Sequence, residues 1–279
     1  MKNQKEIFDA VSLDCSKITT KSYSTSFTLA IQLLNREYRN AIYSIYGFVR
    51  LADEIVDSFH DYNKKKLIAE LRYSTIEALE KKISLNPIIN SFQNTVKKYG
   101  IEWVLIDSFL ESMEYDLDHK KCDEQAYKKY IKGSAEAVGL MCLQVFTRKT
   151  PGKYKKLEPY AISLGSAFQK INFLRDLHED YNSLNRVYFP DLDILNFNND
   201  KKRIIEDDIE KDFQNALIGI KLLNKHAKGG VYLAYRYYLS LFHKIKKEDA
   251  ERILSNRVRI SNAKKIIILV YSQIKNRIL

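Results

Sequence analysis

The sequence predicts an all-α protein, and three observations support this fold class. Only 9 Gly and 4 Pro interrupt 279 residues, in which the helix formers Leu, Lys, Glu and Ala are plentiful. No stretch alternates apolar and polar residues as strands do. The apolar fraction of 45% is ordinary for a globular protein with a substantial core. Because no repeat or linker interrupts the chain, we expect one domain over residues 1–279, a bundle of long helices.

The expected helices follow from apolar residues at helical spacing between residues that interrupt helices. They cover residues 22–34, 37–60, 64–83, 88–98 and 102–118, and then 124–147, 153–182, 203–225, 229–245, 248–255 and 262–277. Asn86 and Pro87 separate the third from the fourth, and residues 149–152 separate the sixth from the seventh. Phe189, Pro190 and residues 196–200 mark the longest connection. Gly229 and Gly230 indicate a further break.

Charge and cysteine content restrict the class of protein. The formal net charge is +11, carried largely by separated Lys-Lys pairs that are typical of solvated helix surfaces. A nucleic-acid groove and an anionic membrane surface are the alternatives. Three scattered cysteines, Cys15, Cys122 and Cys142, indicate a reducing compartment. The polar N-terminus is unlike a signal peptide, and the apolar run at residues 266–271 is too short to span a membrane. We expect a cytoplasmic protein, with peripheral contact at the membrane inner face as an option.

The segment LADEIVDSF, residues 51–59, places acids beside residues suited to burial. On a helix, Asp53, Asp57, Arg50 and Tyr46 form a narrow polar stripe. The adjacent apolar arc contains Ile45, Val49, Ala52, Val56 and Phe59. Glu54 points away from both, toward the expected solvent side. A chance pair of surface acids is the simpler interpretation of this segment alone.

A second stripe of the same kind lies in GSAFQKINFLRDLHEDYNSLNRVYFP, residues 165–190. Asp176, Asp180, Asn172, Gln169 and Gly165 share a helix face about 80° wide. Two helices that each carry D-x-x-x-D suggest carboxylates facing one another across a gap.

Four carboxylates in one dry cleft require cations, because their mutual repulsion would otherwise raise their pKa values. Carboxylate oxygens suit Mg²⁺, which also retains waters and binds substrate phosphate oxygens. Arg50, with Arg175 or Arg186, would bind the remaining phosphate charge. The residues therefore predict a metal-dependent diphosphate site inside a helical bundle.

Four stretches resemble one known family, the trans-acting head-to-head isoprenyl synthases, which comprise the squalene and phytoene synthases. They are YSTSF (residues 23–27), AIYSIYGFVRLADEIVD (41–57), YIKGSAEAVGLM (130–141) and FQKINFLRDLHEDYNSLNRVYFP (168–190). The match runs through most of the chain. Two positions depart from the family pattern: Tyr23 stands where His is frequent, and His178 stands where Gly is frequent. Of the basic segment at residues 256–265, only Arg257 is carried over.

The resemblance implies an isoprenoid-synthase fold around a central apolar cavity and a two-step prenyl transfer. Two allylic diphosphates would condense to a cyclopropylcarbinyl diphosphate, which ionises again and rearranges. The resemblance implies that two or three Mg²⁺ ions, or Mn²⁺ in their place, are bound by Asp53, Asp57, Asn172, Asp176 and Asp180. It gives catalytic roles to Tyr46, Arg50, Tyr130 and Arg175, and substrate binding to Ser24, Arg50, Gln169, Asn172, Arg186, Tyr188 and Arg257.

Small residues at Gly133, Ala135, Ala137 and Gly139 have two interpretations. They would leave room for a long prenyl chain, or they would allow close packing between helices.

The leading functional hypothesis is a phytoene synthase that condenses two geranylgeranyl diphosphates without a reductant, in carotenoid biosynthesis. The near alternative is squalene or dehydrosqualene synthesis from farnesyl diphosphate, with NADPH needed only for squalene. A head-to-tail prenyl synthase or terpene cyclase would usually show D-D-x-x-D, whereas Glu54 follows Asp53 here. A basic helical scaffold or nucleic-acid binder is the alternative outside enzymes. We expect no nucleic-acid partner, because inward acid stripes would repel phosphate.

Overall fold

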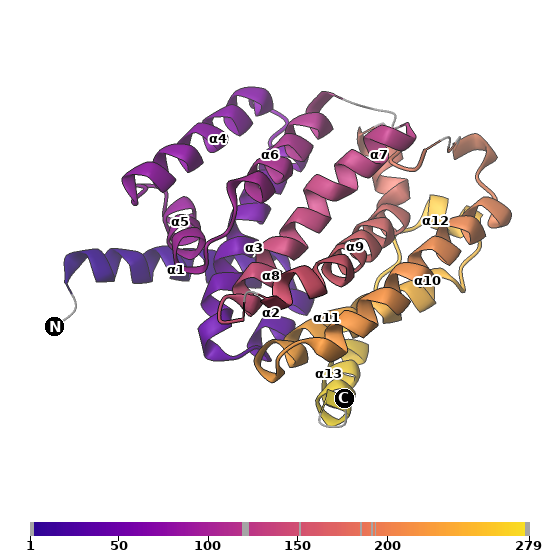
Figure 1. Ribbon diagram of the computed structural model, residues 1–279. Coiled ribbons are helices and arrows are strands. Elements are labelled where there is room, and N and C mark those ends of the chain that lie inside the picture. Colours follow the sequence, from indigo (N-terminus) through magenta and orange to yellow (C-terminus); the bar gives the residue numbers. More distant parts are fainter. Residues whose placement is uncertain are drawn as a thin grey trace.

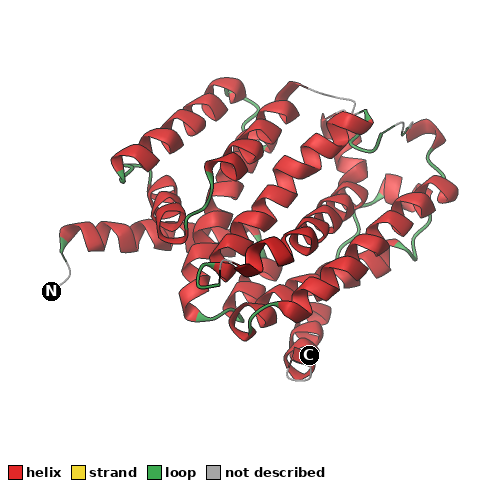
Figure 2. Ribbon diagram, viewed as in Figure 1, coloured by secondary structure: helices red, strands yellow, loops and turns green. Residues whose placement is uncertain are grey.

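The computed structural model describes residues 3–118, 123–150, 152–184, 186–190, 192 and 194–276. These residues form α-helices joined by short loops, and they contain no strand element (Figure 2). The prediction of an all-α fold is therefore confirmed. The helices are α1 (Gln4–Tyr23), α2 (Thr25–Gln32), α3 (Arg36–Asp57), α4 (Lys64–Lys81), α5 (Pro87–Tyr99), α6 (Trp103–Asp118), α7 (Glu124–Ile131), α8 (Ala137–Thr147), α9 (Gly152–Leu184), α10 (Asn199–Leu222), α11 (Lys225–Ile245), α12 (Ala250–Ser255) and α13 (Asn262–Asn276).

The long helix α9 runs through the bundle and contacts α8, α10 and α11, while α3 contacts α1, α5 and α8 (Figure 1). One apolar cluster joins α3 to α5, α6 and α8 around Phe48, Phe92 and Phe109. A second cluster joins α9 to α10 and α11, and includes Phe213 and Phe242. Burying these aromatic side chains supplies much of the hydrophobic stabilisation. The two clusters hold α3 and α9 in place, and residues of both helices line one cavity.

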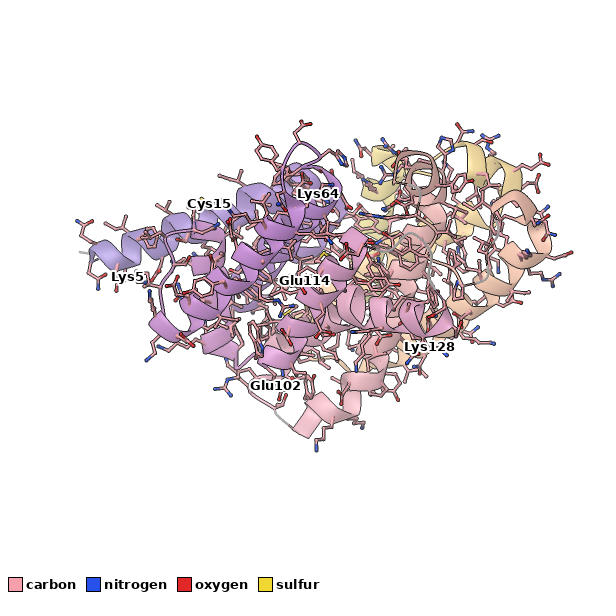
Figure 3. All side chains as sticks on the ribbon, turned by 90° about the horizontal axis from the view of Figure 1, so that it is seen from above. Lys5, Cys15, Lys64, Glu102, Glu114 and Lys128 are labelled. Atoms are coloured by element: carbon pink, nitrogen blue, oxygen red, sulfur yellow. The ribbon has the colours of Figure 1, made fainter. Side chains whose placement is uncertain are left out.

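Helix α1 was not expected, and its buried face explains why. The buried residues are Ser12, Ser16 and Thr20, so no apolar periodicity marks this helix in the sequence. Their small side chains let α1 approach α3 closely, since a Cβ on Gly47 would lie 2.9 Å from the Ser16 Cβ. Viewed from above, Lys5 and Cys15 lie along this helix, which extends beyond the rest of the bundle (Figure 3).

The break predicted at Gly229 and Gly230 is wrong, because both residues lie inside α11. The helix begins earlier, where the Asn224 side chain accepts hydrogen bonds from the backbone N–H groups of His226 and Ala227. A Cβ on Gly230 would lie 2.6 Å from the Ala30 carbonyl oxygen. This glycine therefore serves close packing of α11 on α2, rather than a turn.

Other predicted boundaries also changed. The helix predicted over residues 22–34 is divided at Ser24, whose hydroxyl caps α2 by accepting from the Phe27 N–H. Helix α3 ends at Asp57, so Phe59 lies beyond it and is 36% exposed, outside the apolar arc expected for it. The helix predicted over residues 124–147 contains a π-helical turn, Lys132–Glu136, between α7 and α8. Cys122 lies outside the described residues.

Gly133→Ala is expected to destabilise the protein by about 1–3 kcal/mol, because an added Cβ would collide with the Ser108 carbonyl oxygen and the Ser112 side chain on α6. The matched control is Gly152→Ala, since no atom lies within 4 Å of the position of its Cβ. Urea unfolding of the two variants measures the difference. Equal stability of both variants would contradict the close contact.

Candidate active site

A cavity of about 1040 Å³ lies between α2, α3, α8, α9 and α11. Its charged lining contains Arg50, Asp53, Asp57, His60, Asp116, Arg175, Asp176, Glu179, Asp180 and Arg257. Apolar residues also line it, such as Leu34 after the end of α2, Phe146 of α8 and Leu157 of α9. The cavity thus joins a carboxylate-rich region to an apolar chamber, which suits a ligand with a charged head and a hydrocarbon tail.

Helix α3 contributes the first acid pair, because Asp53, Asp57, Tyr46 and Arg50 all line the cavity as the helical stripe predicted. Glu54 does not line it, but its expected place on the solvent side is wrong: its side chain is only 14% exposed and forms an ion pair with Arg50. The Arg50 guanidinium also lies 4.3 Å from the centre of the Tyr23 ring. Tyr23, at the position where the family often has His, therefore helps to hold this arginine.

Helix α9 contributes the second acid pair. Asp176, Asp180, Asn172 and Gln169 line the same cavity, again as their shared face predicted. The Asn172 Oδ1 accepts a hydrogen bond of 3.3 Å from the Tyr238 hydroxyl of α11.

Gly165 also lines the cavity, and a Cβ there would lie 2.8 Å from the Ala135 carbonyl oxygen. Ala135 of the π-helical turn and Gly139 of α8 line the same cavity, and Gly139 approaches the Ala161 carbonyl of α9. These positions therefore combine close packing against α9 with a place in the cavity wall. Gly133 is not among the lining residues and packs against α6 instead.

Two arginines converge on Asp176. Arg175 donates from Nε to the Asp176 Oδ1 over 2.9 Å. Arg257 follows α12, and its Nε lies 2.7 Å from the same oxygen. Its Nη1 lies 2.9 Å from the Glu179 Oε2. The sequence predicted that Arg257 would bind substrate, and the fold brings it into the cavity. Ser24, Tyr130 and Tyr188 also line the cavity.

Burial and mutual repulsion raise the pKa of two carboxyl groups. The pKa of Asp53 is raised to about 7, first by burial and then by the charge of Asp57. The pKa of Asp180 is raised to about 8, first by burial and then by Asp176 and by Asp57 of the facing helix. Charge on α3 therefore acts on α9, so the two acid pairs face a common space. The cluster has more negative charge than its arginines neutralise.

The donor set fits divalent cations that are shared with a ligand. Among the residues that the structure describes, no three His, Cys, Asp or Glu side chains converge closely enough to hold an ion by themselves. Mg²⁺ is usually held by one or two carboxylates together with waters and substrate phosphate oxygens, so a ready-made cage is not required. Burial and neighbouring carboxylates outweigh the charges of Arg50 and Arg186, so the pKa values of Asp53 and Asp180 stay raised.

Asp116 of α6 is a site residue that the sequence analysis missed. Its Oδ1 accepts from the Tyr188 hydroxyl over 2.8 Å, and its Oδ2 accepts from the Tyr130 hydroxyl over 2.9 Å. Arg186 lies 3.4 Å from Asp116 and 3.3 Å from Asp57, although it does not itself line the cavity. Burial raises the pKa of Asp116 to about 6. Helical spacing could have revealed it, since Asp116 continues the buried face of Leu105, Phe109 and Ser112.

Three other positions were not assigned a role beforehand. Glu179 binds Arg257 at the rim, and Tyr238 stacks on Phe168 with ring centres 3.8 Å apart. His178 is half-buried, and its Nδ1 lies 2.5 Å from the Leu254 carbonyl oxygen. It therefore ties α9 to α12, the segment that leads to Arg257.

A helical bundle in which two acid-bearing helices line one partly apolar cavity is typical of prenyltransferases. Residues 20–264 match the family model described as squalene/phytoene synthase, so the chain belongs to the squalene/phytoene synthase family. The expectation of a head-to-head prenyltransferase is thereby confirmed at family level, and the catalytically silent scaffold is not supported.

Curated relatives carry several different names. A 4,4'-diapophytoene synthase of Staphylococcus haemolyticus is 24% identical over 270 residues, which cover 88% of this chain and 90% of that protein. The chloroplastic phytoene synthase of an Oncidium hybrid cultivar is 27% identical over 91% of this chain and 65% of that protein. A presqualene diphosphate synthase of Rhodopseudomonas palustris is 29% identical, but the match covers 60% of this chain and 58% of that protein.

The fold is similar to that of solved structures in the same family. A dehydrosqualene synthase structure has a TM-score of 0.82 at 19% identity, covering 97% of this chain and 98% of that chain. The squalene synthase HpnC of Alicyclobacillus acidocaldarius has a TM-score of 0.74 at 17% identity, covering 86% of this chain and 95% of that chain.

Proposed function

We propose that this chain, as a single domain over residues 1–279, condenses two geranylgeranyl diphosphates to phytoene. The product forms through a cyclopropyl (prephytoene) diphosphate, and the overall reaction releases two diphosphates and two protons. The observation that carries the proposal is the union of two facing acid pairs with a long apolar chamber in one cavity.

The length of the chamber supports a C20 substrate. Along α9, the lining extends from Asp176 back to Leu157, nineteen residues away, or about 28 Å at the helical rise. The main chain of a C20 prenyl group has sixteen carbons and measures about 20 Å when extended, given C–C bonds of about 1.5 Å. An extended geranylgeranyl group therefore fits below the acid pairs.

In this proposal, Asp53, Asp57, Asn172, Asp176 and Asp180 hold two or three Mg²⁺ ions, which Mn²⁺ could replace. Bound magnesium supplies Lewis-acid stabilisation of the departing diphosphate. Arg50, Arg175, Arg257 and Ser24 bind the diphosphate oxygens. The faces of Tyr46 and Tyr130 stabilise nearby carbocations, and the apolar wall excludes water that would quench them.

A C15 substrate is the second candidate, favoured by one observation. The diapophytoene synthase relative aligns over 88% of this chain and 90% of its own length. Two farnesyl diphosphates would then give dehydrosqualene, or squalene if NADPH supplies a hydride. Incubation with each diphosphate and Mg²⁺, with and without NADPH, followed by chromatography of the hydrocarbon, separates these reactions. A C30 product from an equal mixture of both diphosphates would overturn the phytoene proposal.

Ala161→Phe is expected to shift the product from C40 toward C30. Ala161 lines the cavity fifteen residues from Asp176, about 22 Å along α9, so a benzyl group there blocks the end of an extended C20 chain. The neighbouring variant Ile162→Phe is the control, because Ile162 is not among the lining residues. Product analysis from an equal mixture of both diphosphates gives the ratio. An unchanged ratio in Ala161→Phe would show that chain ends do not reach this depth.

The proposal also places the chain in the cytoplasm, in keeping with the free thiols of Cys15 and Cys142. Its partners are prenyl diphosphates, and no nucleic acid is required. Among the described helices, none is long and apolar enough to cross a membrane.

A further inference from the structure

The C-terminal helix α13 exposes an apolar stripe. Five of its side chains are between 46% and 68% exposed: Ile266, Ile267, Val270, Tyr271 and Ile274. At 100° per residue they fall within an arc of about 140°. The opposite face carries Ile268 and Ser272, which are buried, and α13 packs on α11 through that side. The helix is therefore apolar both toward the protein and toward the surroundings.

Of the helices around this stripe, α11 and α13 are basic and α2 is uncharged. α2, α11 and α13 contain no Asp or Glu, whereas α11 carries four Lys or Arg and α13 carries three. Much of the net charge of +11 is therefore concentrated in one packed group of helices. Lys264 is exposed near the start of α13. Apolar side chains framed by cations are typical of helices that lie in the interface of an anionic membrane.

The same group of helices forms a wall of the cavity. Ala30 of α2 and Ala234 of α11 line the cavity, and they belong to an apolar cluster that also contains Ile268 and Leu269 of α13. The helix that carries the exposed stripe thus packs directly on side chains of the wall that lines the chamber. In Figure 1, α13 lies at the lower edge of the molecule, beneath α11.

We propose that α13 docks this protein on an anionic lipid bilayer, with residues 266, 267, 270, 271 and 274 inserted at the interface. Such docking would place the α2–α11 wall of the chamber against the membrane. If the proposed function holds, the hydrocarbon product can then pass into lipid without crossing water. Docking itself depends only on α13 and the charge around it.

The test is flotation of the full chain with vesicles, without substrate. The wild type is expected to float with vesicles of equal parts phosphatidylcholine and phosphatidylglycerol, and to stay unbound with phosphatidylcholine alone. Ile267→Asp is expected to weaken binding to the anionic vesicles by about tenfold or more, because an apolar side chain is lost and a repelled charge is added. The matched control is Ile204→Asp, since Ile204 on α10 is 70% exposed and Ile267 is 68% exposed. Equal binding by both variants, or no wild-type binding, would overturn the proposal.

A second measurement tests whether another copy of the chain covers the stripe instead. Sedimentation velocity is expected to give the same oligomeric state for the wild type and Ile267→Asp. An oligomer that Ile267→Asp alone dissociates would overturn membrane docking. Turnover in detergent should match in both proteins, since Ile267 is remote from the acid pairs. A wild-type protein that binds vesicles but does not turn over prenyl diphosphates would refute the proposed function without contradicting the membrane docking.

Discussion

Asp53→Asn is expected to lower kcat by at least about 10²-fold with prenyl diphosphates and Mg²⁺, and Asp176→Asn should do the same. Each change removes an anionic oxygen that would hold a metal ion against the departing diphosphate, and such stabilisation amounts to several kcal/mol. The loss should appear in kcat as well as in kcat/KM, because the interaction strengthens as the diphosphate leaves.

Steady-state kinetics with Asp61→Asn as the control separates this effect from a general loss of charge, since Asp61 is exposed beyond the end of α3. Wild-type turnover by Asp53→Asn with Mg²⁺ would show that the acid pairs have been assigned wrongly.

The same substitution should stabilise the metal-free protein at neutral and alkaline pH. The pKa of Asp53 is raised to about 7 in the folded state, so the fold retains a proton that the unfolded chain releases near pH 4. Deprotonation of Asp53 therefore stabilises the unfolded state relative to the folded state as pH rises from about 4 to 7, and the free energy of unfolding falls over that range. Asp180, with its pKa raised to about 8, extends the decline.

Urea unfolding across this pH range, without metal, should give a shallower decline for Asp53→Asn than for the wild type. The same dependence of the free energy of unfolding on pH in both proteins would mean that Asp53 is better solvated than its burial indicates.

Asp116→Ala is expected to destabilise the protein by about 3–5 kcal/mol. The change leaves the buried Arg186 guanidinium and the hydroxyl groups of Tyr130 and Tyr188 without their shared acceptor. Tyr188→Phe removes only one hydroxyl from the network and should cost about 1 kcal/mol. Urea midpoints and slopes for both variants provide the comparison. A loss in Asp116→Ala no larger than that in Tyr188→Phe would show that other groups satisfy the network.

Local periodicity was sufficient for the two acid helices. Asp53 and Asp57 share a face, as do Asp176 and Asp180, because helix geometry fixes the directions of residues four apart. The resulting stripes line one cavity in the structure. Asn86 and Pro87 likewise marked the start of α5, since their backbone effects act within one helical turn.

Tertiary structure decided the features that depend on which surfaces meet. Helix α1 buries serine and threonine because α3 approaches it at Gly47, and Gly230 lies within a helix because α2 packs against it. Arg257 reaches Asp176 from 81 residues along the chain, a contact that periodicity cannot indicate.

The sequence by itself determined the helical class, the two acid stripes and the resemblance to a family, because each depends on the order and spacing of residues. Only the folded chain decided which partners Asp116 meets in the site, that Glu54 is shielded from solvent, and that the stripe on α13 stays exposed. The physical reason is that a helix specifies its own faces, whereas burial of a face depends on the partners that distant segments supply.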